Sequence, residues 1–94
     1  MQNSYNRGIP LHNLGRFEEA IASYDKALEI KPDFHEAFYN KACSYALNGQ
    51  VDLLMQNLQR AINLNPDKNR EMAKTDSDFD NVRSHPKFKA LIKG

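Results

Sequence analysis

Three aspartates that alternate with other residues offer the first pattern that could do chemistry. Asp76, Asp78 and Asp80 are spaced like the first oxygen ligands of a calcium-binding loop. The pattern then fails, because Asn81 stands where that loop needs glycine and Lys87 where it needs a bidentate glutamate. We therefore predict no metal site here. The carboxylates are expected to cap the N-terminus of the short helix that follows.

Cys43 is the single cysteine of the chain and the next candidate for chemistry. A nucleophilic cysteine needs a histidine as base and a third group that orients this histidine. His12, His35 and His85 do not share a helical face at catalytic or metal-ligand spacing. Cys43 follows Ala42 in the middle of a predicted helix, where a small semi-buried thiol is the commoner outcome.

Other patterns that carry chemistry are missing from the sequence. There is no glycine-rich phosphate loop, no nucleophile elbow and no pair of acids in an apolar setting. The sequence thus predicts a protein that is not an enzyme and needs no cofactor.

Composition bounds the class of protein. The 94 residues suffice for one small domain, and 13 basic against 12 acidic residues give a net charge of +1. Such a balance creates no strong field that would attract nucleic acid or a membrane. One cysteine cannot form an internal disulfide, and no apolar run approaches the roughly 20 residues that span a bilayer. With no signal-like segment at the N-terminus, we expect a soluble cytoplasmic protein.

The element that must organise these residues is a predicted helix between Gly15 and Pro32. Glu18 and Glu19 suit its first turn, where the helix dipole favours negative charge, and Pro32 forces it to stop. Its apolar residues recur at spacings of three and four: Ala20, Ile21, Tyr24, Ala27 and Leu28. The pattern returns later in the chain, where the corresponding residues are Gly49, Leu54, Leu58, Ala61, Ile62 and Pro66.

This period of 34 residues resembles the tetratricopeptide repeat, a helix–turn–helix unit that stacks into a solenoid. The resemblance implies an all-α fold in a single domain, residues 1–94. Repeat one would cover residues 1–34 and repeat two residues 35–68. Residues 69–94 would form a truncated third repeat and a helical cap.

The predicted helices have uneven support. In repeat two they run from residue 34 or 35 to 47 and from 51 to 64, with Asp33 and Glu36 as an approximate capping box. The first helix, within residues 1–14, contains Pro10, which inside a helix costs about 3 kcal/mol. Either the helix begins near Pro10, or its first turn is kinked or frayed. Gly8 would let the neighbouring helix approach closely.

The C-terminal tail is predicted to cap the solenoid, whose last repeat would otherwise expose an apolar face. Two short amphipathic helices are expected, at residues 78–83 and 86–93, with Pro86 in the first position of the second and Ser84 or His85 as its cap. Phe79, Phe88 and Leu91 should be buried against the second repeat.

In the tetratricopeptide family the first helices of successive repeats line a concave groove that binds peptides. By position, the resemblance places these residues in the groove: Gln2, Tyr5, Ile9, His12, Asn13, Glu36, Tyr39, Asn40, Cys43, Ala46, Leu47, Arg70 and Lys74. Tyr5 and Tyr39 lie off the packing stripe, and exposed aromatic residues are typical anchors at interfaces. The alternative for both is that they shield a neighbouring helix.

The resemblance implies a protein-interaction module that binds a partner peptide or segment in this groove. Some members hold a peptide's C-terminal carboxylate, and Asn40, Arg70 and Lys74 match three of the five positions involved. Tyr5 and Ile9 stand where the pattern needs Lys and Asn, so we favour apolar contact through Tyr5, Ile9, Tyr39 and Leu47. The alternative function is an assembly unit that self-associates, either because another copy covers the edge at the first helix or by exchange of that helix. The expected state is a monomer or a weak homodimer.

Overall fold

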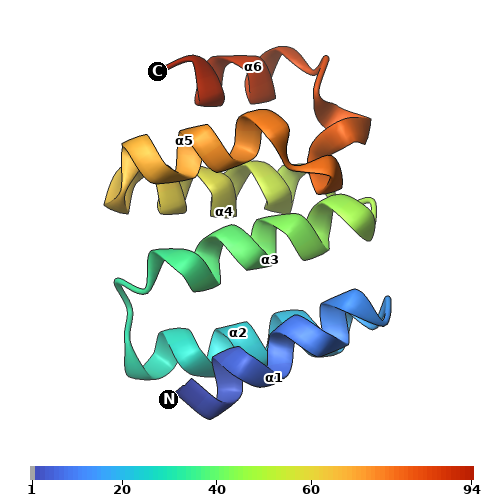
Figure 1. Ribbon diagram of the computed structural model, residues 1–94, viewed down its shortest axis with the longest axis vertical. Helices are drawn as coiled ribbons and strands as arrows, with labels where there is room; N and C mark the ends of the chain where they lie inside the picture. Colours follow the sequence, from blue (N-terminus) through green and yellow to red (C-terminus); the bar gives the residue numbers. More distant parts are fainter. Residues whose placement is uncertain (1) are drawn as a thin grey trace.

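The computed structural model describes residues 2–94, with the side chains of Gln2 and Asn3 left out of the description. The described residues form helices that stack as antiparallel pairs, with the two ends of the chain at opposite ends of the stack (Figure 1). Within this part of the chain, no helix is long and apolar enough to cross a membrane. In chain order the elements are α1 (Gln2–Asn13), α2 (Phe17–Ile30), α3 (His35–Leu47), α4 (Val51–Leu64), α5 (Pro66–Thr75), the 3₁₀ helix η1 (Ser77–Val82) and α6 (Pro86–Lys93).

The two helix–turn–helix units share one turn geometry. Gly15 has φ +80°, its N–H bonds to the His12 carbonyl, and the next N–H bonds to the Leu11 carbonyl. Gly49 has φ +77° and an equivalent pair of bonds. This is a Schellman motif, which needs a left-handed residue after the helix and therefore favours glycine. The 34-residue repetition seen in the sequence thus recurs in backbone geometry.

The predicted bounds of α3, α4 and α6 are confirmed, but the capping box before α3 is wrong. The residue before α3 is Phe34, and no side chain caps this end. Phe34 is buried, with its ring 4.6 Å from that of Tyr5. Burial of this ring fixes the entry to α3, so the helix begins one residue later than Asp33 would require.

Helix α1 passes through Pro10, which rules out the alternative in which the helix begins there. Pro10 is exposed, so water can reach the Asn6 carbonyl that has no N–H partner at position 10. The predicted close approach at Gly8 is confirmed, because a Cβ there would lie 2.5 Å from Cε1 of Tyr24. Helix α1 therefore packs through its glycine against α2.

The tail belongs to the hydrophobic core, as predicted. Phe79 of η1 and Phe88 of α6 are fully buried with ring centroids 5.3 Å apart, and Leu91 is partly buried beside them. The Nδ1 atom of His85 accepts the N–H of Lys87 at 3.1 Å, which confirms the cap of α6. A separate apolar cluster joins α2 and the start of α3 through Ala20, Tyr24, Ala27, Phe34 and Ala37.

Candidate functional site

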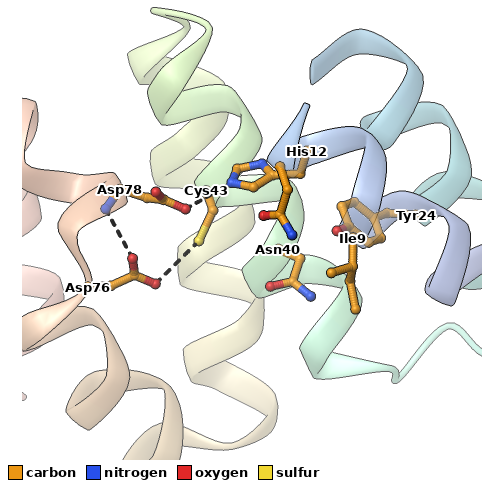
Figure 2. Close-up of a pocket in the computed structure, with 8 residues that line it drawn as sticks. Ile9, His12, Tyr24, Asn40, Cys43, Asp76 and Asp78 are labelled. Carbon is orange, nitrogen blue, oxygen red and sulfur yellow. Dashed lines mark hydrogen bonds and ion pairs between the residues drawn. The ribbon is translucent and has the colours of Figure 1, made fainter. Parts of the chain in front are cut away.

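A cavity of about 180 Å³ opens between the first repeat, α3 and the turn that joins α5 to η1 (Figure 2). Its wall combines carboxylates, side-chain amides, a thiol, an imidazole, an isoleucine and a tyrosine. The lining residues are Ile9, His12, Asn13, Tyr24, Asn40, Cys43, Asp76 and Asp78.

His12 connects three elements at one side of this cavity. Its Nε2 lies 2.9 Å from Oδ2 of Asp78, and its Nδ1 lies 2.7 Å from Oγ of Ser44. A carboxylate only accepts hydrogen bonds, so we assign the proton to Nε2 and let Nδ1 accept from the Ser44 hydroxyl. The imidazole thereby joins α1, α3 and η1.

Asp76 organises the opposite side. Its Oδ1 accepts the N–H of Asp78 at 3.0 Å, which confirms the predicted capping role at the start of η1. Its Oδ2 accepts the hydroxyl of Tyr39 at 2.8 Å and, more weakly, the thiol of Cys43 at 3.7 Å. These contacts hold the turn before η1 against α3.

The prediction that Tyr39 is an exposed anchor is wrong. Tyr39 is only 5% exposed, because Phe79 packs edge-on against its ring at 5.7 Å and Asp76 binds its hydroxyl. Burial, with smaller contributions from Cys43 and Asp76, raises the pKa of this hydroxyl far above its usual value. The tail covers the inner face of α3 at this point, which the sequence did not indicate.

Cys43 is buried, with 4% of its surface exposed, rather than semi-buried. Burial raises the pKa of its thiol, and the nearby charges of Asp76 and Asp78 raise it further. The thiolate is the reactive form, so this cysteine is a poor nucleophile at neutral pH. The ligand atoms of Cys43, Asp76 and Asp78 lie within 4.8 Å of one another, but Asp76 already accepts three hydrogen bonds from the protein.

Of the thirteen residues predicted to form the peptide-binding groove, five line the cavity: Ile9, His12, Asn13, Asn40 and Cys43. Tyr5 lies next to it, where its hydroxyl accepts an N–H of Asn40 at 2.9 Å and its ring packs on Phe34. Leu47 is exposed at the end of α3, outside the cavity wall. The side chain of Gln2, a further groove residue, lies outside the described residues.

Arg70 and Lys74 lie in a different hollow, between α5 and α6. Nε of Arg70 donates to the Leu91 carbonyl at 3.0 Å, and Nζ of Lys74 pairs with Glu71 at 3.0 Å. These two cations are therefore not assembled with Asn40 into one carboxylate-binding set.

Sequence reasoning missed the contribution of Asp76 and Asp78 to the cavity wall. The sequence pattern predicted that both would cap the short helix of the tail, and Asp76 does cap η1. Their second contacts, with His12, Tyr39 and Cys43, depend on how the tail folds back over α3. Local sequence spacing carries no signal for that path.

Curated proteins with similar sequences include three named "Photosystem I assembly protein Ycf3". The protein from Prochlorococcus marinus (strain MIT 9303) is 33% identical over 64 residues, which is 65% of this chain and 37% of that protein. The one from Synechococcus sp. (strain CC9902) is 32% identical over 65 residues, 66% of this chain and 38% of that protein. An uncharacterized protein of Methanocaldococcus jannaschii is 31% identical over 48 residues, 51% of this chain and 56% of that protein. The chain thus matches between 37% and 56% of the length of these relatives.

Family models place the repeats directly. A model described as "TPR repeat" matches residues 11–49, and one described as "Tetratricopeptide repeat" matches residues 35–68. Together these matches cover the stretch that contains the two turn glycines and the helices α2, α3 and α4. The chain therefore belongs to the tetratricopeptide repeat family.

Proposed function

We propose that this protein is an interaction module that holds a segment of a partner protein along α1 and α3, at the mouth of the cavity. The observation that carries the proposal is the cavity itself, which lies between the first helices of two successive repeats and has polar walls. Protein partners are a general property of the tetratricopeptide family, to which the chain belongs. The printed name of two relatives, an assembly protein, fits the same kind of role.

Binding suits this cavity better than catalysis. Its volume of about 180 Å³ is well below the roughly 300–1,000 Å³ of ordinary small-molecule sites. The buried thiol of Cys43 has a raised pKa, and both ring nitrogens of His12 are engaged in hydrogen bonds. We therefore propose a module without catalysis of its own, acting in the cytoplasm, where a lone cysteine stays reduced.

The partner would contact a narrower surface than the sequence suggested. Tyr39 is covered by η1, so it is excluded as an anchor in this conformation. Ile9 is 38% exposed at the cavity rim, and Asn13 and Asn40 offer amides beside it. A partner segment would therefore pack on Ile9 and hydrogen-bond to the two amides.

A random peptide display library, selected against the immobilised protein, tests the proposal. Selected peptides should bind the Ile9→Ala variant more weakly than the wild type. Ile30→Ala is the matched control, because Ile30 is an exposed isoleucine on α2, away from the cavity. Failure to select any peptide, or equal loss in both variants, would contradict the proposal.

The alternative, an assembly unit that self-associates, is favoured by the first repeat alone. Leu14 and Ile30 are 71% and 62% exposed, the highest values among the large apolar side chains of the described residues. A second copy could cover them, either by simple contact or by exchange of α1. Light scattering over a concentration series tests for self-association. A constant monomer mass would exclude this alternative.

A further inference from the structure

The carboxylates in the cavity wall lack a permanent cation. Within the part of the chain that the structure describes, Asp78 has only the imidazole of His12 within ion-pair distance, and Asp76 has no basic side chain within that distance. Four other acidic side chains have a lysine or arginine partner: Glu19, Asp25, Glu71 and Asp80. The carboxylates of Asp76 and Asp78 thus have no lysine or arginine within ion-pair distance, although the Arg83 guanidinium donates to the Asp76 backbone carbonyl at 2.6 Å.

Hydrogen-bond acceptors remain available there. An ionised carboxylate offers about four lone-pair sites. Asp78 uses one for His12, and its side chain is 28% exposed. Asn40 gives an amide N–H to Tyr5, which leaves its carbonyl oxygen as a further acceptor on the wall.

The cavity also has an apolar side. Figure 2 shows Asp76 and Asp78 on one side of the site and Ile9 and Tyr24 on the other, with Asn40 between them. Lysine and arginine match this arrangement, because they bury an apolar stem and keep the charged head hydrogen-bonded. The volume of about 180 Å³ suits one such side chain and excludes a folded segment.

We infer that the partner segment inserts a lysine or arginine side chain into this cavity, with its charged head on Asp78 and Asp76 and its stem on Ile9 and Tyr24. This inference rests on the proposed function and adds the chemistry of the partner. Glu36 adds negative charge near this cavity. Burial raises the pKa of the neighbouring Tyr5 hydroxyl, and the charge of Glu36 raises this pKa further. An acidic partner segment would be repelled at this face.

A metal ion fits the wall less well than a basic side chain does. At Asp76 it would compete with the protein hydrogen bonds of Tyr39, Cys43 and the η1 backbone, which take three of about four acceptor sites on this carboxylate. A lysine or arginine can use the free acceptor sites of Asp78 and Asn40 and the one left on Asp76, so we favour it.

The test uses the peptide that binds best after library selection. Its basic residue is replaced by an uncharged analogue of similar shape, citrulline for arginine or norleucine for lysine. We expect at least a ten-fold loss of affinity, equivalent to about 1.4 kcal/mol. The loss should shrink at high salt, because the pairing is partly exposed.

Variants of the protein give the reciprocal test. Asp78→Asn should weaken the basic peptide ten-fold but leave the citrulline or norleucine peptide unchanged. Asp52→Asn is the matched control, since it removes the same charge from an exposed position on α4. Asn40→Asp should tighten binding of the basic peptide, and Tyr5 can still donate its hydroxyl to the new carboxylate. This variant keeps the test valid if Asp78→Asn loosens the tail, which thermal unfolding reports.

The possible results distinguish failure of the inferred basic side chain from failure of the proposed function. Peptides that bind at Ile9 but carry no basic residue would overturn the inference and leave the proposed function intact. Absence of any peptide binding would overturn the proposed function. A titration with cobalt(II) tests the metal alternative. If cobalt gives a thiolate-to-cobalt absorption band that is absent in Cys43→Ser, and if cobalt also blocks binding of the basic peptide, the cavity is a metal site instead.

Discussion

His12 and Asp78 are 66 residues apart in the chain, and their side chains meet at 2.9 Å. This contact, with the bond from His12 to Ser44, fixes the tail to both repeats at once. Breaking it should therefore lower the stability of the whole domain, and a double-mutant cycle measures by how much. We expect His12→Ala and Asp78→Asn to be non-additive, with a coupling of about 0.5–3 kcal/mol in denaturant unfolding. Simple additivity would show that the tail is held by its phenylalanines alone.

Gly8 is the point of closest approach between α1 and α2. In Gly8→Ala the new methyl would sit 2.5 Å from the Tyr24 ring, which must move. Overpacking of this kind costs about 1–3 kcal/mol, against a gain of up to about 1 kcal/mol in helix propensity. We expect a net loss of stability, measured by denaturant midpoint, while Arg7→Ala on the exposed face of α1 should be nearly neutral. A stabilised Gly8→Ala variant would mean that the two helices pack more loosely.

Pro10 should be a site where stability can be gained. It is exposed and lies inside α1, so an alanine could donate its N–H to the Asn6 carbonyl without a new clash. Pro10→Ala is expected to raise the free energy of unfolding by about 1–3 kcal/mol. An unchanged denaturant midpoint would indicate that α1 contributes little to the cooperative fold.

The tail is expected to be indispensable for the fold. Phe88 is fully buried against Phe79, and truncation to alanine leaves a cavity in the core shared by α3, α4, α5 and the tail. Phe88→Ala should therefore cost about 3–5 kcal/mol in thermal or denaturant unfolding. Lys89→Ala, at the exposed neighbouring position, is the control. If both variants lost the same small amount of unfolding free energy, the tail would not be part of the core.

Much of the fold could be predicted from the sequence because it depends on local patterns. The turn glycines Gly15 and Gly49, the apolar spacing of α2 and α4, and Pro86 at the start of α6 each specify nearby backbone. The cavity could not be predicted to the same extent. Its acidic wall depends on where residues 76–78 pass over α3. This path is set by the burial of Phe79, which is a long-range contact.

The same folding-back explains which groove residues were misplaced. Tyr39 has the spacing of a groove residue, and the tail, which has no such regular spacing, covers it. Arg70 has the position of a carboxylate ligand, but α6 folds against α5 and its Leu91 carbonyl accepts the Arg70 N–H. Position within a repeat predicts the direction of a side chain and not what later segments place over it.

Recognition of a partner's C-terminal carboxylate is the last property that the geometry addresses. Arg70 and Lys74 lie between α5 and α6, in a hollow that Asn40 does not line, and the open cavity is walled by carboxylates. A terminal carboxylate in this cavity would be repelled by the carboxylates of Asp76 and Asp78, so it would add no binding affinity there. We expect one selected peptide to bind equally well as free acid and as C-terminal amide, in a calorimetric titration. Lys74→Ala should leave both affinities unchanged. A ten-fold loss on amidation, about 1.4 kcal/mol, would show that the peptide reaches α5 and that its end carries the recognition.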